Sequence, residues 1–208
     1  MRLFLIFLLS FNFSLMSQDL PFSSIPEAPQ EYNATNSIRR MIQGLGFRYY
    51  WATEGLRASD LNYRPSEEAQ NTLETLQHIY GLSTTVLNAA KNQASLRPAP
   101  RPTSNLKELR FATLENLEKT AALFDQYADK ELEELNIIFE REGKQSKFPL
   151  WNLINGPIAD AIYHTGQIVS FRRTSGNPIE KGVNVFLGIK NSYSQSTKFS
   201  SFFSSIRL

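Results

Sequence analysis

Four stretches of this 208-residue chain repeat apolar side chains at intervals of three and four residues. They cover residues 35–56, 71–90, 105–129 and 150–174. That spacing places apolar side chains on one face of an α-helix, and each such face needs other helices to cover it. We therefore predict an all-α fold in which a four-helix bundle occupies residues 35–178.

Polar residues mark where these helices begin. Asn71 and Glu74 are spaced as a capping box for the second helix, and Ser104 or Asn105 caps the third. In the fourth stretch, Gly156-Pro157 either kinks the helix or marks its true start.

Two segments between the helices have other patterns. Residues 97–102 carry three prolines and are predicted to form a stiff connector. Residues 136–148 combine β-branched and aromatic residues with a Glu-Gly turn, which predicts a short hairpin before the last helix.

The amino terminus has the pattern of a secretory signal peptide. A single arginine precedes the apolar run LFLIFLLSFNFSLM, which is shorter than the roughly 20 residues that a membrane span needs. We expect residues 1–17 to be removed, leaving an extended lead-in at 18–34 and a carboxyl-terminal extension at 179–208. The mature protein is then periplasmic or secreted, with no stable membrane span; the alternative is a buried first helix.

Composition limits the chemistry. The chain has no cysteine, which excludes thiolate metal sites and cysteine nucleophiles, and only two histidines. A net charge of +2 with interspersed signs gives no long-range field for nucleic acid, so no nucleic-acid partner is expected.

Both histidines lie in predicted helices. Asp160 precedes His164 by four residues, a step of about 400° that puts both side chains on one helix face. If the second and fourth helices face each other, His78 adds a third metal ligand and leaves open positions for water and substrate. The alternatives are a buried structural role for His78 and a surface pair between Asp160 and His164.

A resemblance to a known family is carried by two segments. The last helix contains AIYHTGQI at 161–168, followed by Phe171-Arg172-Arg173 and Gly176. Upstream, LNYRP at 61–65 precedes a helix that includes Gln77-His78-Ile79. Over residues 35–178 these motifs resemble the DinB-like (YfiT-like) metal-binding four-helix bundles.

The resemblance implies a divalent metal, commonly zinc or nickel, and a bundle that often forms a homodimer. At position 160 that family usually has histidine. The carboxylate of Asp160 still binds metal and favours harder ions, so iron or manganese also fits. The substitution also leaves open that Asp160 only orients a ligand.

The family includes thiol-dependent transferases, an isomerase and members described only as metal-dependent hydrolases. Because an exported protein meets less of the cytosolic thiol pool, we expect a metal-dependent hydrolase of an unidentified small molecule. The alternatives are a metal-dependent thiol (S-)transferase and a non-catalytic bundle that binds a small molecule or a partner.

Three further side chains are candidates for the chemistry. Glu74 either orients His78, acts as a general base or caps its helix. Tyr163 either donates to a substrate oxygen or packs in the core, and Gln167 either lines the pocket or packs. Arg172 and Arg173 either bind an anionic group or complement the helix dipole.

Overall fold

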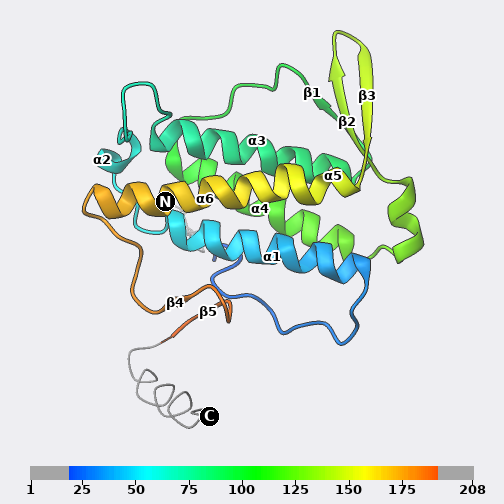
Figure 1. The fold of residues 1–208 in the computed structure, drawn as a ribbon, viewed down its shortest axis with the longest axis horizontal. Coiled ribbons are helices and arrows are strands. Elements are labelled where there is room, and N and C mark those ends of the chain that lie inside the picture. The colour runs from blue at the N-terminus through cyan, green and yellow to red at the C-terminus, as the bar shows by residue number, and fades with distance from the viewer. Residues whose placement is uncertain (1–18, 192–208) are drawn as a thin grey trace, which may run out of the picture.

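The computed structural model describes residues 19–191, and this part of the chain is mostly helical (Figure 1). The predicted signal peptide at 1–17 lies outside the described residues, as does most of the predicted extension at 179–208. Both stay predictions. No helix within residues 19–191 combines the length and the apolar character needed to cross a membrane.

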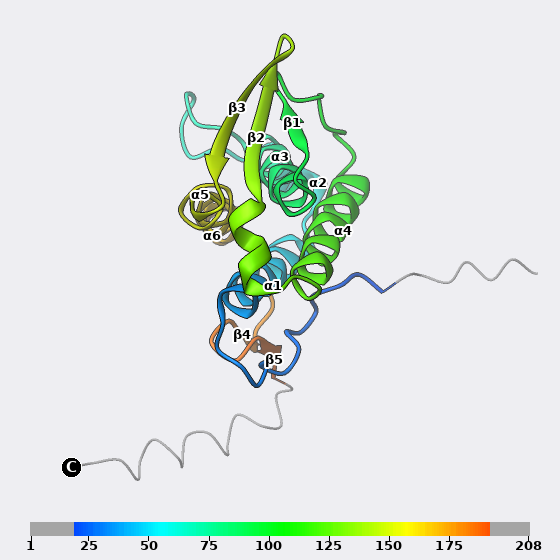
Figure 2. The ribbon, with the colours of Figure 1, turned by 90° about the vertical axis from the view of Figure 1, so that its right-hand side faces the viewer.

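Four long helices lie side by side. They are α1 (Ala34–Thr53), α3 (Thr72–Ala90), α4 (Leu106–Phe124) and α6 (Ala159–Thr174). Seen end-on, they surround a common centre, with α3 packed against α4 and α6, and α1 against the same two helices (Figure 2). Their apolar faces form one core, which includes Ile42, Leu45, Leu76, Ile79, Leu109, Leu117 and Ile168.

The predicted helix starts are largely confirmed. Asn71 accepts a hydrogen bond from the Glu74 amide, and Glu74 accepts one from the Asn71 amide, so the capping box is complete. For α4 the cap is Asn105, which accepts from the Glu108 amide at 3.2 Å. The helix ends at Phe124, earlier than the predicted 129, and is followed by a 3₁₀ helix, η1 (Asp129–Glu134).

A three-stranded sheet stands beside the carboxyl-terminal part of α3. It consists of β1 (Ala94–Leu96), β2 (Asn136–Arg141) and β3 (Lys144–Pro149), in that order. The predicted hairpin is confirmed as β2–β3, and Glu142 and Gly143 at its turn both have positive φ, as a type I′ turn requires. Strand β1 was not predicted; it pairs parallel to β2.

The last helical stretch is interrupted where Gly156-Pro157 was expected to kink it. A short helix, α5 (Trp151–Leu153), leads into a π-helical segment, η2 (Ile154–Ile158), before α6 begins. Gly156 has non-helical dihedrals (φ −95°, ψ −108°), and Pro157 has no amide hydrogen to donate. The kink is therefore built by these two residues.

The two ends of the described chain meet beside α1. A short helix, α2 (Ala58–Leu61), lies in the predicted turn, and a small hairpin, β4 (Val183–Asn184) with β5 (Ile189–Lys190), follows α6. The Ile25 amide donates to the Gly188 carbonyl, which ties the lead-in to this hairpin.

Candidate metal centre

The two histidines of the chain come together with Asp160 on the surface between α3 and α6. The Nε2 atom of His78 lies 3.2 Å from Oδ2 of Asp160, and Nε2 of His164 lies 3.3 Å from Oδ1 of the same carboxylate. One potential ligand atom from each residue lies within 4.8 Å of the others. The structure therefore brings together the three side chains that the sequence singled out.

Gln167 fixes the orientation of His164. Its Oε1 lies 2.7 Å from Nδ1 of His164, one helical turn away on α6. When Nδ1 donates this hydrogen bond, neutral His164 carries its lone pair on Nε2, which is the atom that faces Asp160. Metal-binding histidines are commonly oriented in this way by an acceptor on the other ring nitrogen.

The chemistry of this donor set fits a cation. In that tautomer the Nε2 lone pair of His164 faces a carboxylate oxygen 3.3 Å away, and two acceptors at this distance repel each other. A proton on the imidazole or a divalent metal ion removes the repulsion. A nitrogen–oxygen–nitrogen set of this kind suits zinc, nickel or iron.

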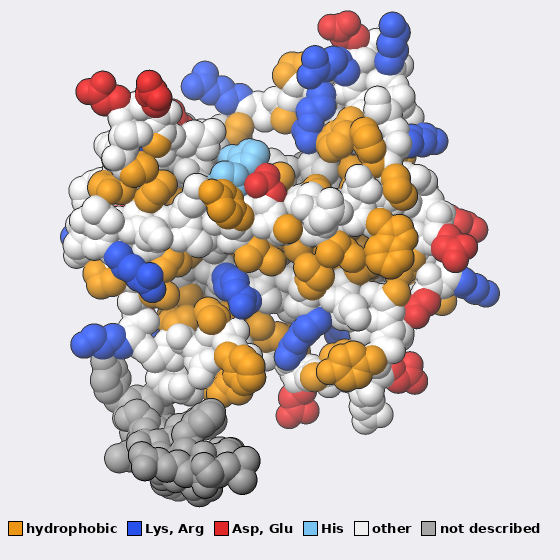
Figure 3. Space-filling model, in the orientation of Figure 1, with side chains coloured by type: hydrophobic (Ala, Val, Ile, Leu, Met, Phe, Trp, Pro, Cys, Tyr) orange, Lys and Arg blue, Asp and Glu red, His pale blue; other side chains and the backbone are white. Residues whose placement is uncertain are grey.

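The cluster is open on one side. The side chains of His78 and Asp160 are 41% and 43% exposed, whereas that of His164 is 17% exposed. Histidine is visible at the molecular surface, among hydrophobic side chains (Figure 3). An ion held here would keep coordination positions open to water or to a substrate.

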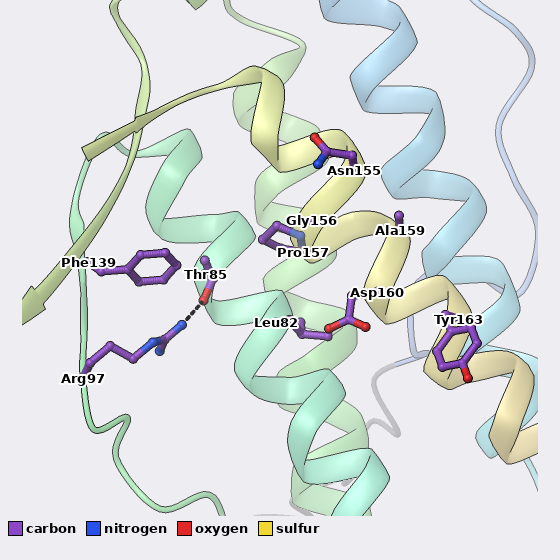
Figure 4. A pocket seen from close by; sticks show the side chains of 10 residues that line it. All are labelled: Leu82, Thr85, Arg97, Phe139, Asn155, Gly156, Pro157, Ala159, Asp160 and Tyr163. Atoms are coloured by element: carbon purple, nitrogen blue, oxygen red, sulfur yellow. Dashed lines mark hydrogen bonds between the residues drawn. The ribbon is translucent and has the colours of Figure 1, made fainter. Parts of the chain in front are cut away.

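A cavity of about 520 Å³ adjoins the cluster and shares Asp160 with it. Its volume is in the range of small-molecule sites. Tyr163 lines it from α6, beside the His164 ring, with the two ring centroids 5.3 Å apart. Gly156 and Pro157, the residues of the kink, form another part of its wall (Figure 4).

The other candidate residues differ in position. Tyr163 is 64% exposed, so it is not packed in the core, and Gln167 contacts His164 directly. Glu74 completes the capping box of α3 and pairs with Arg64 at 3.6 Å, which is the capping role that the sequence allowed.

Arg172 is buried and caps a neighbouring helix. Its guanidinium donates to the carbonyls of Ala52 and Glu54, at the carboxyl end of α1, at 2.9 and 2.6 Å. These carbonyls belong to the end of a helix, where intrahelical donors run out. Arg172 therefore joins α6 to α1 and does not face the cavity.

Two residues of the cavity were missed by the sequence reasoning. Arg97 follows β1 and Phe139 lies in β2, and both line the wall opposite α6. Arg97 was assigned to a connector and Phe139 to a hairpin. The parallel pairing of β1 with β2 brings Arg97 and Phe139 together, and no local sequence pattern predicts this pairing.

A mostly helical protein with two histidines and one carboxylate gathered at a cavity is a candidate metalloprotein. The model of the DinB family matches residues 35–181, and the chain belongs to this family. Among curated proteins and among solved structures, none matches the chain.

Proposed function

We propose that the four packed helices form a DinB-type four-helix bundle and that His78, Asp160 and His164 hold one divalent metal ion. The strongest support is that three potential ligand atoms, one from each of these side chains on α3 and α6, lie within 4.8 Å of one another. Zinc or nickel is the ion that the family resemblance favours. Iron or manganese also suits a set that contains a carboxylate.

We further propose that the protein is a hydrolase of a small molecule. A divalent ion with an open position lowers the pKa of a bound water to about 7, which makes hydroxide available near neutral pH. The cavity of about 520 Å³ beside Asp160 is large enough for a small organic substrate.

The chain's own residues would contribute binding and orientation. Gln167 holds the His164 ring, and the Tyr163 hydroxyl would donate a hydrogen bond to an oxygen of the substrate. Leu82 and Pro157 supply an apolar wall for the bound molecule to contact. Glu74 is engaged at the start of α3, so we assign it no catalytic role.

Export is part of the proposal. The leader at residues 1–17 would send the protein to the periplasm or outside the cell, where low-molecular-weight thiols are scarcer. This favours water over a thiol as the second reactant. A homodimer, as the family resemblance suggests, is compatible with this function and is not required by it.

The proposal is tested with mature protein purified without a histidine tag and assayed against small aryl esters, lactones and amides. We expect turnover by the zinc- or nickel-loaded protein, loss of turnover after chelation, and no recovery of turnover in His164→Ala when metal is returned. Turnover that survives chelation would contradict the metal-dependent mechanism. Turnover that appears only when a thiol is added would replace hydrolysis by thiol transfer.

A further inference from the structure

The cavity contains a cationic group that the metal site does not use. Arg97 is half-buried, and its guanidinium stacks on the ring of Phe139 with its central carbon 4.5 Å from the ring centroid. Its side chain donates to the Thr85 hydroxyl at 3.3 Å and to the Leu96 carbonyl at 3.2 Å. A guanidinium has five N–H donors, so these two neutral acceptors leave several of them without a partner in the described chain.

The positive charge of Arg97 is not balanced locally. Within residues 19–191, no carboxylate lies within ion-pair distance of its guanidinium. Exposed arginines such as Arg101 and Arg173 have no ion pair either, but they do not line the cavity. Burial lowers the pKa of Arg97, and the nearby positive charge of Arg141 lowers it further. A half-buried arginine that faces a cavity without a counter-ion is suited to an anionic ligand.

Arg97 lies on one wall of the cavity, and Asp160, the residue that the cavity shares with the candidate metal cluster, lies on the opposite wall. Figure 4 shows Arg97 and Phe139 on the side of the strands, and Asp160 and Tyr163 on the side of α6, with Leu82 and Pro157 between them. The two walls would thus contact different ends of one bound molecule.

We propose that the cavity binds a small carboxylic acid with a flat apolar body, whose carboxylate pairs with Arg97. The apolar body would lie along Leu82, Phe139 and Pro157. In the metal-free protein, the carboxylate of Asp160 repels the anionic end, so the far end of the molecule is the one that lies beside Asp160. That such an acid is the substrate rests on the proposed function. That the cavity binds it does not require the metal.

The test compares two probes of the same shape, 2-naphthoate and its neutral amide 2-naphthamide. Binding is measured by calorimetry and by ligand fluorescence, on protein stripped of metal by chelation and on zinc-loaded protein. On the metal-free wild type we expect naphthoate to bind about tenfold more tightly than naphthamide, as a charge-assisted pair with arginine provides.

The matched variants are Arg97→Gln and Arg101→Gln, because Arg101 is an exposed arginine in the same connector. Arg97→Gln should abolish the preference for naphthoate and leave naphthamide binding unchanged, whereas Arg101→Gln should retain the preference. Arg97→Lys, which keeps the charge and loses the planar fork, should weaken naphthoate binding by a few fold. It also serves as the test variant if Arg97→Gln fails to fold.

Several outcomes would overturn the inference. They are equal binding of the two probes to the wild type, no binding of naphthoate, or equal effects of Arg97→Gln and Arg101→Gln. Naphthoate binding that needs zinc and ignores Arg97→Gln would mean that the carboxylate goes to the metal. Absence of zinc uptake with an intact Arg97-dependent preference would contradict the proposed function and leave the anion site standing.

Discussion

His78 of α3 and His164 of α6 meet edge to face, with their ring centroids 4.6 Å apart and their planes at 85°. The helices that carry the two rings pack against each other, and Ile79 and Thr165, the residues that follow the histidines, are both buried. The two imidazoles therefore lie at the edge of the contact between α3 and α6, and the carboxylate of Asp160 lies close to both rings. The geometry of the cluster depends on the α3–α6 packing and on Gln167.

The contact between Gln167 and His164 predicts an effect on metal affinity without loss of a ligand. Gln167→Met removes the acceptor at 2.7 Å from Nδ1 and keeps a side chain of similar length. We expect the affinity for zinc, measured by calorimetric titration, to fall by about 10- to 100-fold, as is typical when a ligand histidine loses its orienting partner. Gln70→Met, at an exposed position, is the control. Equal affinities in the two variants would show that Gln167 does not orient His164.

The buried position of Arg172 predicts that its replacement lowers stability far more than replacement of the adjacent Arg173. Arg172→Met leaves the buried carbonyl of Ala52 and the partly buried carbonyl of Glu54 without their donor, so the free energy of unfolding should fall by about 3 kcal/mol. Arg173→Met removes an exposed side chain and should change it by less than about 0.5 kcal/mol. Urea denaturation followed by circular dichroism measures both. Similar losses in the two variants would contradict the capping role.

Asp60 is a buried carboxylate with three partners. It accepts hydrogen bonds from Arg57 at 2.8 Å, from the Ser175 hydroxyl at 2.9 Å and from the Asn177 amide at 2.7 Å. The Arg57 hydrogen bond is the main reason that the pKa of Asp60 lies well below its usual range, against the opposing effect of burial. The folded state thus binds a proton at this site less readily than the unfolded chain does.

This lowered pKa gives a pH dependence of stability with a definite sign. The contribution of Asp60 is complete above the unfolded-state value of about 3.9 and declines as the pH falls towards the lower folded-state pKa. Asp60→Asn should therefore lower the free energy of unfolding by about 2–3 kcal/mol near neutral pH, and the difference from wild type should shrink below about pH 4. Asp125→Asn removes an exposed carboxylate that pairs with Arg39 on the surface, and should lower the free energy of unfolding by less than about 1 kcal/mol near neutral pH. A deficit in Asp60→Asn that stays constant down to about pH 2 would contradict this assignment.

The sequence predicts the parts of this fold that local patterns determine. Periodicity locates the four long helices, the Asn71–Glu74 box starts α3, and Gly156-Pro157 marks the kink. It also puts His78 and His164 on helices. The two histidines can meet only if α3 faces α6. The family resemblance, and not the periodicity, gave the reason to expect that arrangement.

Features that depend on long-range pairing were not predictable in the same way. Strand β1 is three residues long and exists because it pairs with β2, some 40 residues later in the chain. That pairing places Arg97, the residue after β1, in the wall of the cavity. The sequence pattern relates Arg172 only to the end of its own helix, whereas two of its acceptors, the carbonyls of Ala52 and Glu54, lie at the end of α1. A burial pattern on one helix does not reveal which neighbour a long side chain reaches.

The central claim is that His78, Asp160 and His164 bind one metal ion. Elemental analysis of protein purified without a histidine tag tests it most directly, because the chain contains no other histidine and no cysteine. We expect about one divalent ion per chain in the wild type and in Asp125→Asn, and a loss of most of that metal in folded His78→Ala and His164→Ala. A wild-type protein that contains no metal and takes up neither zinc nor nickel when they are added, or equal metal content in all four proteins, would contradict the account.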